Sequence, residues 1–208
     1  MLSIRAEGRK KESEIGTMAN YQEILAARLS EKRYLHSLGV AGTAARLASK
    51  NKVDPEQARL AGLLHDYARD LPPGELLTLA AGAGLITCEL ERRLPILLHG
   101  PVGALLIKQD LGIKDRAVLQ AVARHTVGAV AMTALDKIIY LADIIEPERR
   151  FPGVEELRRL AAADLNAALL KAFETSILYL VGKGQPLHPV TIEARNYLLL
   201  SGQEETSV

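Results

Sequence analysis

The sequence predicts an all-α protein that folds as one domain of packed helices. Alanine and leucine are abundant, runs of β-branched residues are short, and apolar residues recur every three or four positions, which is the helical period. The 208 residues are enough to bury one core, and no repeat, low-complexity segment or linker divides the chain. We expect the domain to span residues 19–202, with residues 1–18 as a disordered tail or a misassigned start and residues 203–208 as a second tail.

Capping and turn residues indicate where the helices begin and end. Ser30 is a candidate N-cap, and Asn51 stops the helix that follows it. Asp54 is a second candidate N-cap, followed by Pro55 at the first helical position, and glycine and proline clusters separate the later segments. The expected helices cover residues 21–29, 30–50, 54–70, 75–83, 88–94, 102–111, 114–124, 133–145, 154–162, 164–181 and 189–200.

Composition and charge argue against several classes of function. The 26 basic and 25 acidic residues leave a net charge of +1, which creates no general attraction to nucleic acid or to an anionic membrane. Aromatic residues make up 4% of the chain, so few side chains can stack on bases. No run of 18 apolar residues occurs, and the N-terminus lacks the apolar segment of a secretory signal. We therefore expect a cytoplasmic protein with no membrane and no nucleic-acid partner.

Histidine and aspartate side chains interrupt helix faces that are otherwise apolar. His36 lies among residues with core spacing, and the His65-Asp66 doublet continues an apolar stripe. His125 and Asp143 do the same in two later helices. A single histidine in such a place is more often a core residue than a ligand, but one metal ion would satisfy all of these groups at once. Because the chain has one cysteine, histidine and carboxylate must supply the ligands.

These residues, in this order, resemble the signature of the HD-domain metal-dependent phosphohydrolases. His36, His65-Asp66 and Asp143 match its metal-binding positions. Two intervening histidines, His99 and His125, resemble those of a subgroup with extra histidines. His99 also stands at a helix start, where free N–H groups suit phosphate.

The strings around these residues are similar to those of one group within that family, the symmetrical diadenosine tetraphosphate hydrolases. The resemblance covers roughly residues 20–200, and two features depart from it: Arg150 stands where an acidic residue is expected, and the first 18 residues have no counterpart. The matching strings are LLHDYARDLP, LLHGPVGA, ARHTVG, LDKIIYLADIIEP and HPVTIEARN.

The resemblance implies a single HD-domain helical bundle that binds a divalent metal, which is ferrous iron in this group, through His36, His65, Asp66 and Asp143. Asp66 and His65 are the expected catalytic residues, with Asp66 as a metal ligand that also accepts a proton from the attacking water. Attack on phosphorus would release ADP, so that diadenosine tetraphosphate gives two ADP. A homodimer is the expected assembly.

A polyphosphate carries more negative charge than one metal ion neutralises, so cations and N–H donors are expected nearby. Lys137 is one candidate cation, although its position also allows it to face solvent. The expected substrate-binding residues are His36, His99, His125, Thr126, Asp143, Arg149, His188, Thr191 and Arg195.

Two alternatives stay open at this point. The same metal centre can serve another substrate, such as a nucleoside monophosphate or a guanosine alarmone, because the pocket rather than the centre sets specificity. The second alternative is a non-catalytic module that senses nucleotides. It is disfavoured because the sequence has a metal-binding residue at every metal-binding position of the signature.

Overall fold

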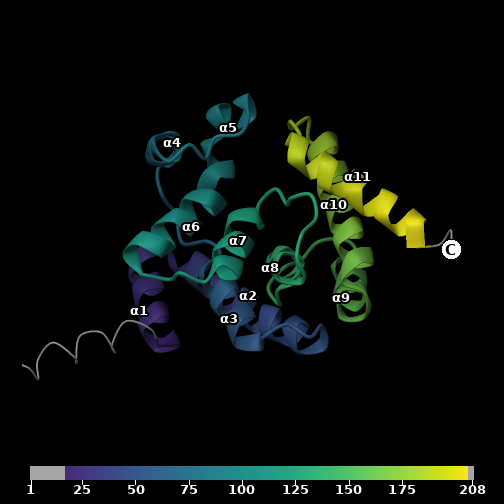
Figure 1. Ribbon diagram of the computed structural model, residues 1–208, viewed down its shortest axis with the longest axis horizontal. Coiled ribbons are helices and arrows are strands. Elements are labelled where there is room, and N and C mark those ends of the chain that lie inside the picture. The colour runs from purple at the N-terminus through teal and green to yellow at the C-terminus, as the bar shows by residue number, and fades with distance from the viewer. Residues whose placement is uncertain (1–16, 206–208) are drawn as a thin grey trace, which may run out of the picture.

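A computed structural model describes residues 17–205 of the chain, and within them it shows α-helices, one short 3₁₀ helix and no strand. The predicted all-α class is confirmed (Figure 1). The helices are α1 (Met18–Arg28), α2 (Glu31–Lys50), α3 (Pro55–Leu64), α4 (Pro73–Gly82), α5 (Glu89–Arg93), η1 (Pro95–Leu98), α6 (His99–Asp110), α7 (Arg116–Arg124), α8 (Ala134–Ile145), α9 (Val154–Ala163), α10 (Leu165–Gly182) and α11 (Pro189–Glu205).

Side-chain caps explain several of the helix starts. Asp54 accepts a hydrogen bond from Glu56 N, as expected for an N-cap that precedes a proline. Asp115 and Asp164 cap α7 and α10 in the same way. Ser30 does occupy the N-cap position of α2, but its side chain makes no capping hydrogen bond. The start of α2 therefore depends on packing more than on its cap.

Two of the boundaries that differ from the sequence-based expectation lie next to the expected metal centre. Helix α3 ends at Leu64 rather than near residue 70, because the chain tightens into turns in which Tyr67 N and Arg69 N donate to carbonyls three residues back. Helix α6 begins at His99, directly after η1, which the periodicity did not predict. Both changes occur beside histidines of the HD signature, where tertiary contacts override local preference.

The ends of the chain fall only partly within the described residues. Residues 1–16 of the expected N-terminal tail lie outside them, whereas Thr17 caps α1 and Met18 begins it. At the other end, α11 runs to Glu205 and so extends into the segment that was expected to be a tail.

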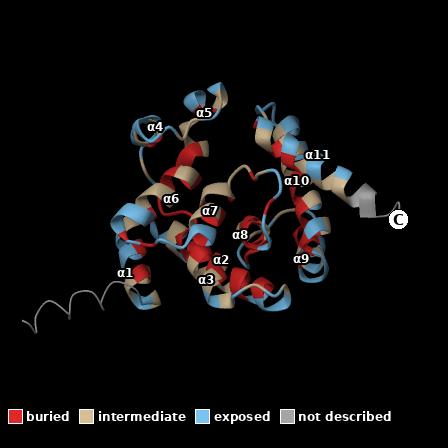
Figure 2. Ribbon diagram, in the orientation of Figure 1, coloured by how far each residue is buried: buried red, intermediate tan, exposed pale blue. Residues whose placement is uncertain are grey.

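The core lies mainly between α2, α3, α7 and α8, whose inner faces are buried (Figure 2). Helices α2 and α3 pack closely because Gly62 has no side chain: a Cβ there would lie 3.1 Å from Ala41 Cα and Val40 O. A smaller cluster that includes Leu76, Leu98 and Val102 joins α4, η1 and α6. The close contact of α2 with α3 fixes the distance between the two helices that carry His36 and the His65-Asp66 doublet.

Helix α10 is the described helix that is long and apolar enough to cross a membrane by length and composition, a test that core helices of water-soluble domains also pass. Its first half packs into the domain through residues such as Leu169 and Phe173. Its second half lines a large cavity through residues such as Ser176 and Leu180. These two roles account for much of its apolar composition.

Candidate metal centre

Four histidines and two aspartates from separate parts of the chain meet in the middle of the bundle. The histidine rings pack edge to face in the order His36, His65, His125 and His99. The centroids of neighbouring rings in this series are 4.8–5.2 Å apart. The elements that carry them are α2 for His36, the turn after α3 for His65 and Asp66, the start of α6 for His99, the end of α7 for His125, and α8 for Asp143.

Each of the four imidazoles uses its Nδ1 atom for a hydrogen bond to an oxygen acceptor. Nδ1 of His36 lies 3.2 Å from Glu146 Oε1, and Nδ1 of His65 lies 2.8 Å from Gly62 O. Carbonyl and ionised carboxylate oxygens only accept, so Nδ1 must carry the proton. The same holds for His99 with Ile96 O at 2.6 Å and His125 with Val122 O at 2.7 Å. All four rings are thereby fixed with Nε2 directed into the centre.

The Nε2 atoms of His36 and His65 are buried and have no hydrogen-bond partner. His36 Nε2 lies 2.9 Å from Asp143 Oδ1, but without the alignment of a hydrogen bond. His65 Nε2 lies 3.5 Å from Asp66 Oδ2 and 3.9 Å from Asp143 Oδ1. Unpartnered lone pairs facing carboxylates are costly unless a cation lies between them. Imidazole nitrogen and carboxylate oxygen are ligands of divalent transition metals. Ligand atoms of His36, His65 and Asp143 lie within 4.8 Å of one another, and so do those of His65, Asp66 and His125, so these residues fit such an ion.

His99, His125 and Thr126 form a second group of polar side chains, which lies next to Asp66. Nε2 of His99 lies 3.0 Å from Nε2 of His125, and Asp66 Oδ1 lies 3.2 Å and 3.7 Å from these two atoms. Thr126 Oγ1 is within 3.4 Å of both rings. Burial lowers the pKa of His99. Burial also acts to lower the pKa of His125, but the combined effect of Asp66, Asp143 and the Val122 carbonyl outweighs it and raises the pKa. One proton between the two rings accounts for their close approach.

Burial and neighbouring groups set the charges of the central residues. Burial lowers the pKa of the His65 imidazole to about 4, although Asp66 acts to raise it. Burial acts to raise the pKa of the Asp66 carboxyl, but His65 and the hydrogen bonds to two further histidines outweigh it and hold the pKa well below its usual range. The pKa of Asp143 is lowered, against burial, by the histidines around it. At neutral pH a neutral His65 therefore faces two carboxylates.

Two residues of the centre were missed by sequence reasoning. Glu146, which is 2% exposed, holds the His36 ring, and Gly39 leaves room for it, since a Cβ there would lie 2.8 Å from Glu146 Oε2. Arg33 Nη1 lies 3.1 Å from Asp66 Oδ2. Helical spacing was the available signal, because Arg33 comes three residues before His36 and Glu146 three after Asp143.

Arg149 is one of the expected substrate-binding residues that the fold brings to the centre. Its Nη2 atom lies 2.6 Å from Asp143 Oδ1, and its Nε–H donates to the Asp143 carbonyl at 2.9 Å. The side chain is 39% exposed. A guanidinium at this position remains accessible to an anion that approaches the centre.

A cavity of about 790 Å³ opens beside the centre. Thr126 and Arg149 line it on the side of the centre, and Tyr140, Phe151 and Tyr179 give it an apolar wall. Two more expected residues, His188 and Thr191, also line it. His188 is 5% exposed and faces Glu91, and Thr191 Oγ1 donates to Val127 O at 2.8 Å. The cavity thus has the size and the mixed lining of a small-molecule site.

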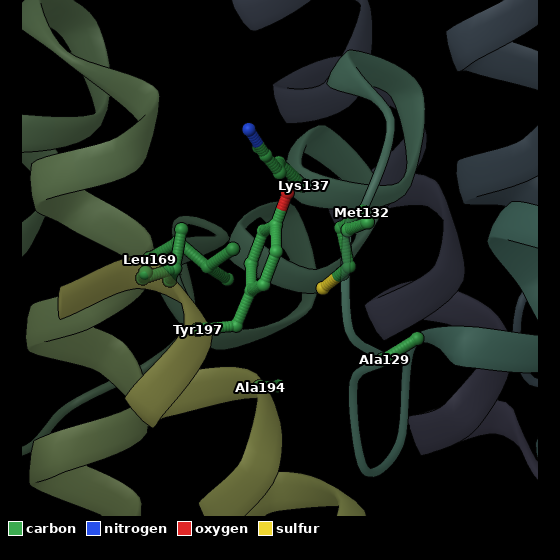
Figure 3. A pocket seen from close by; sticks show the side chains of 8 residues that line it. Ala129, Met132, Lys137, Leu169, Ala194 and Tyr197 are labelled. Atoms are coloured by element: carbon green, nitrogen blue, oxygen red, sulfur yellow. The ribbon is translucent and has the colours of Figure 1, made fainter. Parts of the chain in front are cut away.

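Two of the basic residues expected near the substrate, Arg195 and Lys137, lie outside the cavity. Arg195 is not among the cavity-lining residues and pairs with Glu174 at 2.8 Å. Lys137 donates to Asn166 Oδ1 at 2.6 Å and lines a separate pocket of about 150 Å³ beside Tyr197 and Met132 (Figure 3). The centre therefore relies on Arg33 and Arg149 rather than on these two side chains.

Comparison with known proteins agrees with this geometry. The model of the HD domain matches residues 33–148, which contain the four histidines and the two aspartates of the centre. Proteins named "Bis(5'-nucleosyl)-tetraphosphatase, symmetrical" are similar over nearly their full length: that of Bacillus subtilis is 40% identical and covers 86% of this chain and 98% of its own. That of Halalkalibacterium halodurans is 41% identical, with 86% of this chain and 95% of its own covered.

A solved structure also points to the HD-domain family. The crystal structure of a predicted HD superfamily hydrolase involved in NAD metabolism from Clostridium acetobutylicum matches with a TM-score of 0.87 and 45% identity, over 90% of this chain and 99% of that one. Fold, ligand geometry and sequence agree, and the chain is a member of the HD-domain family.

Proposed function

We propose that this protein is a metal-dependent hydrolase that cleaves diadenosine tetraphosphate symmetrically into two ADP. The observation that carries the proposal is the common orientation of four imidazoles, whose Nδ1 atoms are tied down while the unpartnered Nε2 atoms of His36 and His65 face two carboxylates. The names of the similar bacterial proteins support the choice of substrate.

We assign the metal to His36, His65, Asp66 and Asp143, and we propose ferrous iron as the native ion. A divalent ion held by these ligands would lower the pKa of a water molecule and polarise a phosphoryl oxygen. The nitrogen and oxygen ligand set is compatible with iron and with other first-row metals. Glu146 fixes the His36 ring from behind, which keeps its Nε2 atom free to bind.

We assign the proton transfer from the attacking water to Asp66, with His65 as its catalytic neighbour. The two oxygens of Asp66 face different histidines, Oδ2 toward His65 and Oδ1 toward His99, and this supports a role at the junction of the two groups. Arg33 holds Oδ2 from the side of α2 and limits the carboxylate to one orientation. Such a fixed acceptor is what in-line attack on phosphorus requires.

We propose that the phosphates contact His99, His125, Thr126 and Arg149, and that one nucleoside enters the cavity lined by His188 and Thr191. The partly exposed guanidinium of Arg149 supports a phosphate contact. The apolar wall of the cavity supports a contact with a base. We keep Arg195 as a proposed substrate contact, although it pairs with Glu174 and does not line the cavity.

The test is an anaerobic assay of the iron-loaded protein with diadenosine tetraphosphate, with chromatographic separation of the products. We expect two ADP from the wild type and none from His65→Ala, with Lys137→Gln as a control that keeps activity because Lys137 lines a separate pocket. AMP plus ATP would contradict symmetrical cleavage. Turnover of a nucleoside monophosphate or a guanosine alarmone in its place, or nucleotide binding without turnover, would favour one of the alternative functions.

We also propose that the protein acts in the cytoplasm as a homodimer. Leu178, Val181 and Leu200 are 72%, 58% and 63% exposed on α10 and α11, and such apolar side chains are typical of an interface. Light scattering should give twice the chain mass for the wild type and the single-chain mass for Leu178→Glu with Val181→Glu. A wild type that scatters as a monomer would contradict the dimer.

A further inference from the structure

A second group of metal-ligating side chains lies outside the HD centre. Cys88 is the N-cap residue of α5, Glu91 lies within α5, and His188 directly precedes α11 (Figure 1). Glu91 and His188 are each 5% exposed, and Cys88 is partly exposed. One potential ligand atom of each residue lies within 4.8 Å of the other two. Segments almost a hundred positions apart thus bring a thiol, a carboxylate and an imidazole to one point.

The two distances at His188 Nε2 are compatible with the edges of a tetrahedral ion site, and the one to Glu91 is long for a hydrogen bond to a carboxylate. Bond lengths of about 2.3 Å for Zn–S and about 2.1 Å for Zn–N and Zn–O give tetrahedral edges of about 3.6 Å for S···N and about 3.4 Å for N···O. Cys88 Sγ lies 3.4 Å from His188 Nε2, and Glu91 Oε1 lies 3.3 Å from the same atom. A hydrogen bond between an imidazole N–H and a carboxylate is usually shorter, at about 2.7–3.0 Å.

Hydrogen bonds orient the Glu91 carboxylate through its Oε2 atom and leave Oε1 available as a metal ligand. Its Oε2 atom accepts hydrogen bonds from the Thr87 N–H, the Thr87 hydroxyl and the Cys88 N–H. This fixes the carboxylate and directs Oε1 toward His188. Metal-binding carboxylates are commonly oriented by hydrogen bonds of this kind.

The His188 ring must change its tautomer to bind an ion. Its Nδ1 atom accepts a 3.3 Å hydrogen bond from Val190 N–H, so the proton is on Nε2 in the metal-free protein. Binding through Nε2 moves the proton to Nδ1 and breaks this long contact. The loss is small, because Val190 lies in the first turn of α11, where N–H groups have no acceptor within the helix and turn to water.

We propose that Cys88, Glu91 and His188 form a second metal site, which takes Zn²⁺ and is separate from the HD centre. One thiolate, one imidazole and one carboxylate are a ligand set that zinc accepts, with a fourth position left for water. The ion joins α5 to the start of α11. Because His188 lines the cavity and Leu94 and Leu97 follow α5 along its wall, an ion at this site stabilises one side of the cavity.

The experiment uses the full chain, with Co²⁺ as a spectroscopic substitute for Zn²⁺. Cys88 is the one cysteine of the chain, so a thiolate-to-cobalt charge-transfer band reports on this site alone. We expect the band in the wild type and in His65→Ala, which disables the HD centre, and we expect Zn²⁺ to displace it. Cys88→Ser should abolish the band, and Glu91→Gln or His188→Asn should weaken cobalt affinity by about tenfold or more.

Zinc binding provides a second measurement that does not depend on catalysis. Zn²⁺ should raise the melting temperature of His65→Ala but not that of the double variant His65→Ala with Cys88→Ser. The proposal is overturned if His65→Ala, in which the HD centre is disabled, shows no thiolate band at stoichiometric Co²⁺ and the wild type shows none at two equivalents. It is also overturned if the band survives unchanged in Glu91→Gln and His188→Asn, because the cysteine then binds metal without its neighbours.

Discussion

At the residue scale, the geometry of the centre depends on hydrogen bonds made by the imidazole nitrogens that face away from the metal site. Each imidazole is oriented through Nδ1, and three of the four acceptors are backbone carbonyls, those of Gly62, Ile96 and Val122. His36 differs because its acceptor is the side chain of Glu146. Among the four rings, only the orientation of His36 can therefore be changed by substituting the residue that accepts its Nδ1–H hydrogen bond.

Glu146→Gln should weaken metal binding by about 10- to 100-fold, because an amide is a poorer acceptor for the His36 Nδ1–H and no longer fixes the ring. Metal titration of the purified variant measures the change, and the variant should remain folded. Glu148→Gln is the matched control, since the same chemical change is made at an exposed position two residues away. Equal affinities in the two variants would contradict the role of Glu146.

The low pKa of His65 predicts how the stability of the metal-free protein depends on pH. Between about pH 6.5 and pH 4 the unfolded chain binds a proton at this residue and the folded protein does not. Stability therefore falls as the pH decreases through this window, by at most about 1.4 kcal/mol per pH unit from this group. Urea unfolding at pH 5 and pH 6.5 should show a smaller decrease in His65→Gln than in the wild type. An identical decrease in both would show that His65 is not the group responsible.

At the element scale, the spacing of α2 and α3 sets the size of the metal centre, because α2 carries His36, and His65 directly follows the end of α3. The two helices approach closely at Gly62, where the nearest atoms are the backbone of Val40 and Ala41. Backbone atoms cannot move aside as the end of a side chain can. A larger residue at this position has to separate the helices.

Gly62→Ala should therefore destabilise the protein by about 1–3 kcal/mol and weaken metal binding at the same time. Gly42→Ala is its control in α2, since a Cβ there meets nothing within 4 Å. Alanine favours a helix, so this second variant should gain about 0.5–1 kcal/mol. Chemical denaturation and metal titration of both proteins test the pair. Similar stability changes in the two variants would rule out packing as the cause.

At the scale of the whole molecule, the centre joins α2, α3, α6, α7 and α8, and the four proposed metal ligands connect three of these parts, namely α2, the turn after α3, and α8. Metal bound to the folded state alone stabilises that state by mass action. At a free metal concentration 100 times Kd, the gain is about 2.7 kcal/mol.

Removal of the metal with a chelator should thus lower the melting temperature, and ferrous iron should restore it. The Cys88→Ser background keeps the second group of ligands from contributing to the result. Adding His65→Ala to that background should abolish the response to iron, because an essential ligand is missing. A rise in melting temperature that persists in this double variant would show that the stabilising ion binds elsewhere.

The sequence predicted the helix order well, because caps and periodicity are local properties. Asp54 and Pro55 begin α3 where expected, for example. The end of α3 at Leu64 and the short helix η1 were not predicted. At both places the chain departs from regular helix so that His65 and His99 reach Asp66, and the benefit of those contacts is invisible in a local window.

The sequence by itself determined the helical class and indicated the HD-domain family, and its resemblance to that family implies the four residues proposed to bind the metal. These depend on residue type and spacing, which are written in the chain. Only the tertiary structure decided that Arg33 and Glu146 support the centre, that Lys137 lies apart from it, and that Cys88 meets Glu91 and His188. Such pairings are set by how whole helices pack, because a small rotation or shift of one helix changes every long-range contact it makes.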